Sequence, residues 1–509
     1  MGAEAAHVLV FPVPLQGHIN VMLHLATALA AAAGVHVTFL HTDHNLRRLG
    51  NAAAATTAGS PRRLRFLSVP DGLPDDHPRS ASDVPVMVDS LRGAGQAAYR
   101  ALLGSLLVGS GGAGGFPPVT SVVADALLTF AIDVAEELGV PALAFRTANA
   151  SSLLAYMSVP RLFELGELPF PPGGDLDEPV RIPSPARSPS TFHRHGDDHD
   201  VHPKLQMLVD LTTGSCKARA VILNTAASLE APALAHIAPR VLDVFAVGPL
   251  HAMSPAPAAA TSLWREDDGC MAWLDDQADR SVMYVSLGSF TVISPEQFTE
   301  FLSGLVAAGY PFLWVLRPDM VTARRRHADL QEAVTAAAGD SKARVVEWAP
   351  QRDVLRHRAV GCFLTRANST LEAAVEGVPT VCWPFFVDQQ INSRFVGAVW
   401  GTGLDMKDVL LGFLDNRNKN SEQNSNTRER WKNEWTQNTR FTANTCATPA
   451  VVARMVREAM ESGEIRTTAQ ALAEKVRQDV ADNGGSSAAE LKRLVGFLRE
   501  LATRIQHAN

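Results

Sequence analysis

The sequence lacks the signatures of several common functional classes. Its five cysteines are scattered without a Cys-x-x-Cys pair, which disfavours a zinc site or a disulfide framework and favours free thiols in a reducing compartment. The net charge of −7 gives no basic excess that would attract a nucleic acid. No Gly-x-Gly-x-x-Gly follows the first apolar run, so a nicotinamide-dependent dehydrogenase is poorly supported.

Charged residues are absent from residues 5–42, as they are from most signal peptides and membrane spans. Pro14, Gly17 and Gly34 interrupt this stretch, however, and Glu4 precedes it in place of basic residues. A buried strand–helix–strand unit explains the stretch better. We therefore predict a cytoplasmic protein without a transmembrane segment.

The chain has 509 residues, 46% of them hydrophobic and 19% charged, which is the composition of a soluble globular protein and the length of two domains. Short apolar runs alternate with helix-length segments in both halves, which predicts two mainly parallel, doubly wound α/β sheets with helices on both faces. Ser294-Pro295-Glu296-Gln297 predicts a capped helix start. The expected strands are His7–Val13, Val35–Leu40, Leu64–Val69, Ser121–Ala124, Ala142–Phe145, Ala220–Leu223, Val244–Val247, Val282–Ser286, Phe312–Leu316, Arg344–Glu347, Gly361–Thr365 and Thr380–Trp383.

Composition also suggests where the domains meet. The segment Pro249–Thr261 is rich in Pro and Ala and has no charge, so we expect an interdomain linker there. Residues 410–448 hold eight of the seventeen asparagines, only two alanines and no apolar periodicity, which favours a disordered insert, either natural or translated from non-coding sequence. The predicted division is an N-terminal domain 1–248, a linker 249–268, a C-terminal domain 269–485 and a helix 486–509 that packs back on the first domain.

A series of motifs in the second half carries a family resemblance. In chain order these are Trp348-Ala349-Pro350-Gln351, His357, Gly361–Thr365, Asn368–Glu372, Gly377-Val378-Pro379 and Asp388-Gln389. The series resembles the signature box of plant family-1 UDP-glycosyltransferases, and Gly17-His18-Ile19-Asn20 and Ser286-Leu287-Gly288-Ser289 are similar to that family too. The resemblance implies a GT-B fold of two Rossmann-like domains facing a cleft, a UDP-sugar donor, an inverting mechanism, and no metal or other cofactor. It also implies a small lipophilic acceptor, and we expect a monomer.

His18 is the candidate catalytic base. It lies at the start of the first predicted helix, whose dipole favours a neutral imidazole that can accept a proton from an acceptor hydroxyl. Asp125 follows another apolar run of the same sheet, and the resemblance makes it the partner that fixes the imidazole tautomer. Each has a structural alternative, namely a helix-start histidine with local hydrogen bonds, and an N-cap for the helix that begins near Leu127.

The resemblance places the donor site in the second domain. Asn368 and Ser369 open a helix, where backbone N–H groups favour an anion, although Ser369 and Glu372 also have the spacing of a structural capping box. For the acceptor, we expect pocket walls from loops around Leu73–Val86 and Tyr156–Pro171. The implied donor contacts are Trp348 and the adjacent Ala349 for uracil, Gln351 and Glu372 for ribose, Ser289, Asn368 and Ser369 for the diphosphate, and Asp388 and Gln389 for the sugar, with Gln389 favouring glucose.

The box departs from the family at one point. Where the family has His-Cys-Gly-Trp, this sequence has only Arg366 and Ala367, so the box is two residues short. Losing a hydrogen bond to a charged diphosphate costs about 1.5–3 kcal/mol, unless Arg366 supplies a charge in its place. Two functions therefore remain open. One is an active O-glycosyltransferase that moves a hexose to a hydroxyl or carboxyl of a plant metabolite, and the other is a catalytically impaired homologue that at most binds small molecules.

Overall fold

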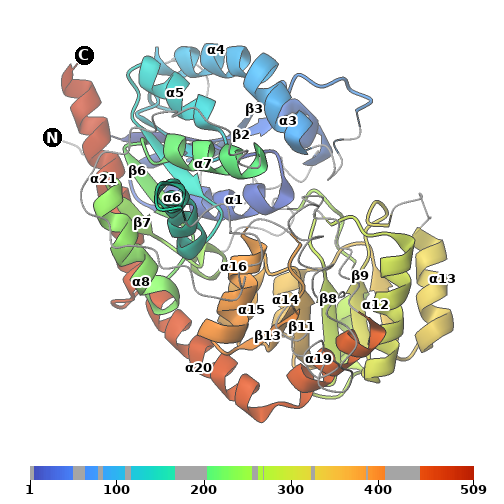
Figure 1. Ribbon diagram of the computed structural model, residues 1–509. Coiled ribbons are helices and arrows are strands. Elements are labelled where there is room, and N and C mark those ends of the chain that lie inside the picture. Colours follow the sequence, from blue (N-terminus) through green and yellow to red (C-terminus); the bar gives the residue numbers. More distant parts are fainter. Residues whose placement is uncertain are drawn as a thin grey trace.

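Two parallel β-sheets, one in each half of the chain, organise the protein (Figure 1). The structure is a computed structural model that describes residues 5–49, 63–77, 79, 84–108, 116–166, 203–254, 262–267, 269–289, 291–321, 327–385, 388–406 and 448–508. The first sheet has the order β3-β2-β1-β4-β5-β6-β7 and the second β10-β9-β8-β11-β12-β13. The strands are β1 Ala6–Phe11, β2 Val35–Thr42, β3 Leu64–Val69, β4 Ser121–Asp125, β5 Ala142–Arg146, β6 Ala220–Leu223, β7 Val244–Ala246, β8 Val282–Ser286, β9 Phe312–Val315, β10 Ala343–Val346, β11 Val360–Thr365, β12 Thr380–Cys382 and β13 Gly403–Asp405.

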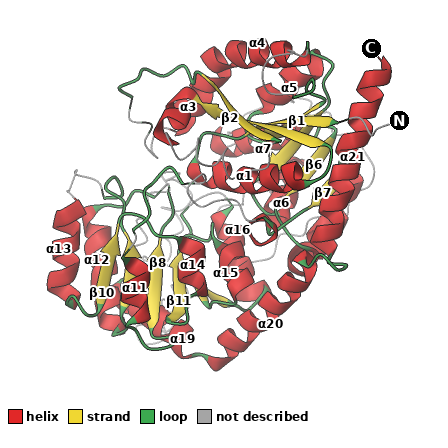
Figure 2. Ribbon diagram, turned by 180° about the vertical axis from the view of Figure 1, so that it is seen from behind, coloured by secondary structure: helices red, strands yellow, loops and turns green. Residues whose placement is uncertain are grey.

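Helices cover both faces of each sheet, which buries the apolar strands from either side (Figure 2). In the first domain α1 and α21 pack on one face and α4 and α5 on the other. In the second, α12 and α19 cover one face and α11, α14 and α15 the other. The helices are α1 Gln16–Ala31, α3 Val84–Ser90, α4 Gln96–Leu107, α5 Thr129–Glu137, α6 Ala150–Glu164, α7 Pro203–Ser215, α8 Ala227–Ile237, α9 Leu250–Met253, α11 Cys270–Asp275, α12 Pro295–Ala308, α13 His327–Ala338, α14 Gln351–Arg356, α15 Thr370–Glu376, α16 Gln389–Arg394, α19 Pro449–Glu461, α20 Gly463–Val480 and α21 Ser486–Ala508.

The C-terminal helices connect the two domains (Figure 1). Helix α20 contacts α15 of the second domain and α8 of the first. Leu494, Leu498 and Leu501 of α21 then enter the core of the first domain. These contacts fix one domain against the other.

The order of strands reverses once in each sheet, and ligands of such sheets bind at that point, beyond the carboxyl ends of the strands. In the first sheet the reversal lies between β1 and β4, and in the second between β8 and β11. His18 follows β1 and Asp125 ends β4, while Ser286 ends β8 directly beside Thr365 of β11. The topology therefore places the candidate residues of both domains at ligand-binding edges.

The predicted two-sheet α/β class is confirmed, and most strand ends lie within two residues of their expected positions. Ser294 and Gln297 form the predicted capping box at α12. The sequence analysis did not predict β13. It expected a loop over Tyr156–Pro171, but residues 156–164 of that segment belong to helix α6. Residues 410–447 lie outside the described residues.

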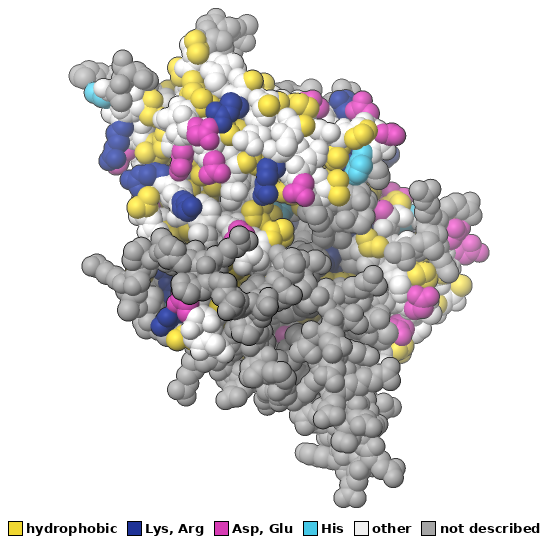
Figure 3. Space-filling model, turned by 45° about the horizontal axis from the view of Figure 1, so that its top comes forward, with side chains coloured by type: hydrophobic (Ala, Val, Ile, Leu, Met, Phe, Trp, Pro, Cys, Tyr) yellow, Lys and Arg dark blue, Asp and Glu magenta, His cyan; other side chains and the backbone are white. Residues whose placement is uncertain are grey.

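The surface of the described residues carries charges of both signs. On the face shown in Figure 3, Lys and Arg side chains alternate with Asp and Glu. None of the described helices is both long and apolar enough to cross a membrane.

Candidate active site

His18 and Asp125 meet at the edge of the first sheet. Nδ1 of His18 lies 2.6 Å from Oδ2 of Asp125, although the residues are far apart in the sequence. The Asp125 side chain is 1% exposed and that of His18 18%. Because Nδ1 is bound to the carboxylate, Nε2 is the nitrogen left to exchange a proton with another molecule.

The Asp125 carboxylate is held in place by the backbone as well. Oδ2 accepts a hydrogen bond from the backbone N–H of Val13 at 3.3 Å, and Oδ1 accepts one from that of Leu127 at 3.1 Å. The contact to Leu127 is a turn and not the helix cap suggested by the sequence, because α5 begins at Thr129 and its N-cap residue, Leu128, makes no side-chain cap hydrogen bond. A carboxylate held at three points fixes the orientation of the imidazole.

The charge environment of His18 differs from the expectation based on the helix dipole alone. Burial lowers the pKa of His18, but the charge of Asp125 and the hydrogen bond to it raise the pKa, and Asp388 adds to this effect. The net pKa is above the ordinary value. The imidazole is thus a stronger base than a free histidine, and it is neutral only at higher pH.

A cavity of about 530 Å³ lies between the two domains. Gln16, Asn20 and His24 of α1 line it from the first domain, and the ends of β8 and β11 line it from the second. All but two of the donor residues expected from the sequence contribute to its wall. Those that do are Ser289, Trp348, Ala349, Gln351, Arg366, Asn368, Ser369 and Glu372, and those that do not are Asp388 and Gln389.

Trp348 stands at one end of this cavity. Its ring is nearly parallel to that of Trp264, with the ring centres 6.2 Å apart and an angle of 24° between the planes. The Arg48 guanidinium lies 5.5 Å from the Trp264 ring on the side of the first domain. Flat aromatic rings of this kind are suited to stacking with a planar heterocycle.

The capping-box alternative for Ser369 and Glu372 is wrong. Ser369 precedes α15, but its side chain caps no backbone N–H of that helix. Its Oγ instead accepts a hydrogen bond of 2.9 Å from Nε2 of Gln351. Burial raises the pKa of Glu372, although the charge of Arg352 acts in the opposite direction. Gln351, Ser369 and Glu372 thus form one polar wall of the cavity.

Comparison with known proteins decides the family. Residues 209–410 match the family described as UDP-glucoronosyl and UDP-glucosyl transferase. The chain is 37% identical to a myricetin 3-O-rhamnoside 1,2-glucosyltransferase of Crocosmia x crocosmiiflora, over 97% of this chain and 96% of that one. It is 36% identical to a 7-deoxyloganetic acid glucosyltransferase of Catharanthus roseus, over 98% of both chains.

The chain belongs to the plant family-1 UDP-glycosyltransferases.

A solved structure agrees with this assignment at the level of the fold. Os79 from O. sativa in complex with UDP matches with a TM-score of 0.71 at 24% identity, over 97% of this chain and 100% of that one. The two parallel-sheet domains of this UDP-glycosyltransferase are therefore the GT-B fold.

The shortened loop of this glycosyltransferase follows β11. Arg366 is buried, and its guanidinium donates hydrogen bonds to Oγ1 of Thr291 and, at 3.3 Å, to Oε1 of Gln389. It also lies 4.5 Å from the Phe385 ring. Burial, together with the nearby charge of Arg317, lowers the pKa of Arg366 to about 9. Arg366 thus places a cation on the cavity wall.

The next residue of the loop has an unusual backbone. Ala367 is fully buried and has φ of +65°, in the left-handed region that favours glycine. Its carbonyl oxygen accepts a hydrogen bond of 2.8 Å from Nδ2 of Asn392. The shorter loop therefore keeps a left-handed residue without the glycine that would adopt it at no steric cost.

Asp388 and Gln389 lie where α16 begins. Burial raises the pKa of Asp388, and Nδ2 of Asn392 donates a hydrogen bond to its Oδ2 at 3.4 Å. Gln389 is 1% exposed, and its Oε1 accepts a hydrogen bond of 2.8 Å from the backbone N–H of Phe385 in addition to the one from Arg366. Asp388 and Gln389 are thus both bound by residues of their own domain.

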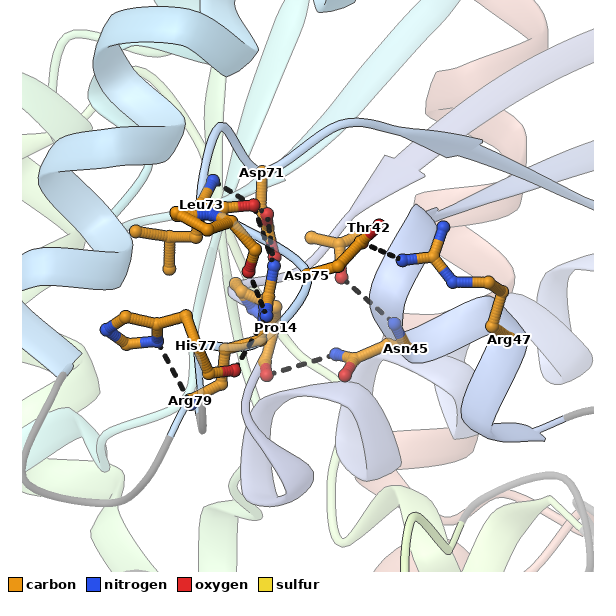
Figure 4. Close-up of polar contacts among 10 residues, drawn as sticks. Pro14, Thr42, Asn45, Arg47, Asp71, Leu73, Asp75, His77 and Arg79 are labelled. Carbon is orange, nitrogen blue, oxygen red and sulfur yellow. Dashed lines mark hydrogen bonds and ion pairs between the residues drawn. The ribbon is translucent and has the colours of Figure 1, made fainter.

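A loop of the first domain borders a second, smaller cavity at the domain boundary (Figure 4). Nε and Nη2 of Arg79 donate to the two carboxylate oxygens of Asp71 at 2.8 and 3.0 Å. Nδ2 of Asn45 donates to the carbonyl of Pro14, just before α1, at 3.1 Å. The cavity measures about 60 Å³ and also contacts Ser289 of the second domain. Hydrogen bonds thus hold this part of the expected acceptor wall in place.

Several residues of the site were missed by the sequence analysis. Arg146 ends β5, so the rule that functional residues follow parallel strands could have identified it. Tyr156, which the sequence analysis placed in an acceptor loop, lies near it on α6. Asn149 and Asn392 give no signal in the sequence, because their pairing depends on how the two domains are placed.

Proposed function

We propose that this chain is an inverting O-glycosyltransferase that transfers glucose from UDP-glucose to a hydroxyl group of a small plant metabolite. The observation that carries the proposal is the 2.6 Å contact between Asp125 and His18, which directly follows Gln16 and Gly17, two residues that line the cavity. Two relatives are named glucosyltransferases, which supports glucose as the sugar. The free cysteines among the described residues suit a reducing compartment such as the cytosol.

In the proposed reaction, Nε2 of His18 accepts the proton of the acceptor hydroxyl. The hydroxyl oxygen attacks the anomeric carbon, while the bond from that carbon to the diphosphate oxygen breaks and UDP leaves. The configuration at the anomeric carbon inverts. Asp125 stabilises the imidazolium that forms.

The donor assignments remain proposals of the same kind. Trp348 and Ala349 hold uracil, Gln351 and Glu372 the ribose, and Ser289, Asn368 and Ser369 the diphosphate. Arg366 supplies a positive charge to the diphosphate in place of the missing histidine. Asp388 and Gln389 bind the sugar hydroxyls. The position of eight of these side chains around one cavity supports the assignment.

The impaired-homologue alternative rests on the shortened loop and on the left-handed Ala367. Calorimetric titration with UDP tests the donor site, since an intact donor site binds UDP and a collapsed one does not. Mass spectrometry of reactions with UDP-glucose and a panel of phenolic and aliphatic hydroxyl acceptors then detects transfer. Failure to bind UDP, or binding without any glucoside, contradicts the proposed function.

A variant with the family loop tests the same point. Replacing Arg366-Ala367 by the four residues His-Cys-Gly-Trp restores the length of the box. If Arg366 is a sufficient substitute for the histidine, the repaired chain and the original consume UDP-glucose at similar rates. A large gain on repair shows that the short loop impairs the diphosphate site.

A further inference from the structure

Arg146 is a buried cation beside the reacting groups of the first domain. It is the last residue of β5, which pairs with β4, the strand that ends at Asp125. The residue is 4% exposed. Its Nε and Nη1 are buried and have no hydrogen-bond partner among the described residues. The plane of the guanidinium therefore presents two donors that nothing in the described chain satisfies.

Nearby carboxylates do not supply the hydrogen-bond acceptors that Arg146 lacks. Burial lowers the pKa of Arg146, while the charges of Asp388 and Asp125 act in the opposite direction. The Asp125 oxygens, however, are bound to His18 and to two backbone N–H groups, and Asp388 is in contact with Asn392. An arginine remains charged when it is buried, and a buried charge without hydrogen bonds is costly. Such a residue is retained more readily where a ligand supplies the missing acceptors.

The surroundings of Arg146 suit an organic anion with a flat or apolar body. The Tyr156 ring lies 5.6 Å from the guanidinium carbon and is buried. The next residue, Thr147, lines the cavity between the domains. Arg146 follows Phe145, which pairs with Asp125 across β5 and β4, so a group bound at Arg146 lies near the partner of the proposed base.

We propose that Arg146 binds a carboxylate of the acceptor, so that the preferred acceptors are hydroxy acids whose hydroxyl, a few bonds away, reaches His18. The proposal rests on the proposed function and narrows its acceptor class. In this proposal the carboxylate binds the protein and the hydroxyl attacks the sugar. A carboxylate paired with a guanidinium is a weaker nucleophile, and an ionised carboxylate would not need His18 to remove a proton. A carboxylate accepts charge-assisted hydrogen bonds from a guanidinium, which favours binding of the acid over its uncharged ester.

The test compares hydroxy acids with their own methyl esters, using aromatic and alicyclic pairs at saturating UDP-glucose. For each acid–ester pair that the enzyme accepts as substrate, we expect the wild-type kcat/KM to be higher for the acid than for its methyl ester. In Arg146→Met the KM of the acid rises by about 10- to 150-fold, the effect of losing hydrogen bonds to a charged group, while the ester is little changed. Arg146→Lys restores part of the preference. Arg161→Met is the matched control, because Arg161 forms an exposed ion pair with Glu164 on α6.

Calorimetric binding of the same acids to the UDP complex provides a readout that needs no turnover, and UDP affinity checks that each variant is folded. Acid-selective binding that is lost in Arg146→Met supports the proposal even if no glucoside forms, in which case the proposed function fails and the binding site stands. The proposal is overturned if the wild type prefers no acid in binding or turnover. It is equally overturned if Arg146→Met impairs acid and ester alike, since that result marks a structural residue.

Discussion

Asn149 of the first domain and Asn392 of the second share a hydrogen bond across the cleft. Nδ2 of Asn149 donates to Oδ1 of Asn392 at 2.6 Å, and Nδ2 of Asn392 donates to the carbonyl of Ala367. Asn149 is also the N-cap of α6, since its Oδ1 accepts from the backbone N–H of Ser152 at 2.8 Å. One pair of amides therefore links the first domain to the loop that follows β11.

Two substitutions at Asn149 separate its two contacts. Asn149→Ser keeps an N-cap residue of equal quality but removes the bond to Asn392, which costs about 0.5–1.5 kcal/mol. Asn149→Ala removes both contacts and costs about 1 kcal/mol more. Urea unfolding measures the stabilities. The KM for UDP-glucose rises by the same factor in both variants, because both lose the link to the loop. A KM that rises only in Asn149→Ala contradicts this link and assigns the effect to the lost helix cap.

The left-handed backbone at Ala367 gives a second prediction. Ala367→Gly removes the clash of Cβ in that conformation and stabilises the protein by about 0.5–1 kcal/mol, measured by urea unfolding. Ala373→Gly, within α15, is the control and destabilises by about 1 kcal/mol. If Ala367→Gly destabilises as much as the control, packing of the Ala367 methyl group outweighs the backbone strain.

The fold could be predicted almost entirely from the sequence, because strands buried on both faces leave continuous apolar runs that alternate with helices. The strand Gly403–Asp405 was missed since three residues give no periodicity. At the site, His18 and Asp125 were named mainly through the family resemblance, and they meet because each directly follows or ends a strand at the same sheet edge. The raised pKa of His18 was not foreseen, since it depends on a carboxylate brought close only by folding.

Local sequence also misled in one place. Ser369-x-x-Glu372 has the same spacing as the true capping box at Ser294 and Gln297, yet only the latter forms. The difference lies in Gln351, which binds Ser369 from a neighbouring helix. Spacing along the chain cannot distinguish a cap from a residue held by a tertiary contact.

This difference predicts opposite effects for two matched serine substitutions. Ser294→Ala removes a working cap and costs about 1 kcal/mol of stability, without changing UDP affinity. Ser369→Ala leaves the stability within about 0.5 kcal/mol but weakens UDP binding, because the hydroxyl and its partner Gln351 face the proposed diphosphate and ribose positions. Urea unfolding and calorimetry with UDP measure the two effects. Unchanged UDP affinity in Ser369→Ala contradicts the proposed donor contact.

The pH profile reports on His18. Its pKa is raised above 6.5, with Asp125 and Asp388 raising it and burial and Arg146 lowering it, so the base is protonated and inactive below this pKa. The kcat/KM therefore increases with pH, and the acid limb has its midpoint above 6.5. Asp125→Asn shifts this limb to lower pH and reduces the plateau, since both the charge and the tautomer control are lost. An acid limb that stays in place in Asp125→Asn assigns the titration to another group.

The most direct test of the account is the rate of glucoside formation by His18→Ala beside the wild type, with UDP affinity measured on both proteins. The account predicts that kcat falls by about 10²–10⁴-fold, the usual contribution of a positioned general base, while the Kd of UDP is unchanged. A His18→Ala variant that binds UDP normally and still forms glucoside at the wild-type rate would contradict the assignment of His18 as the base that deprotonates the acceptor.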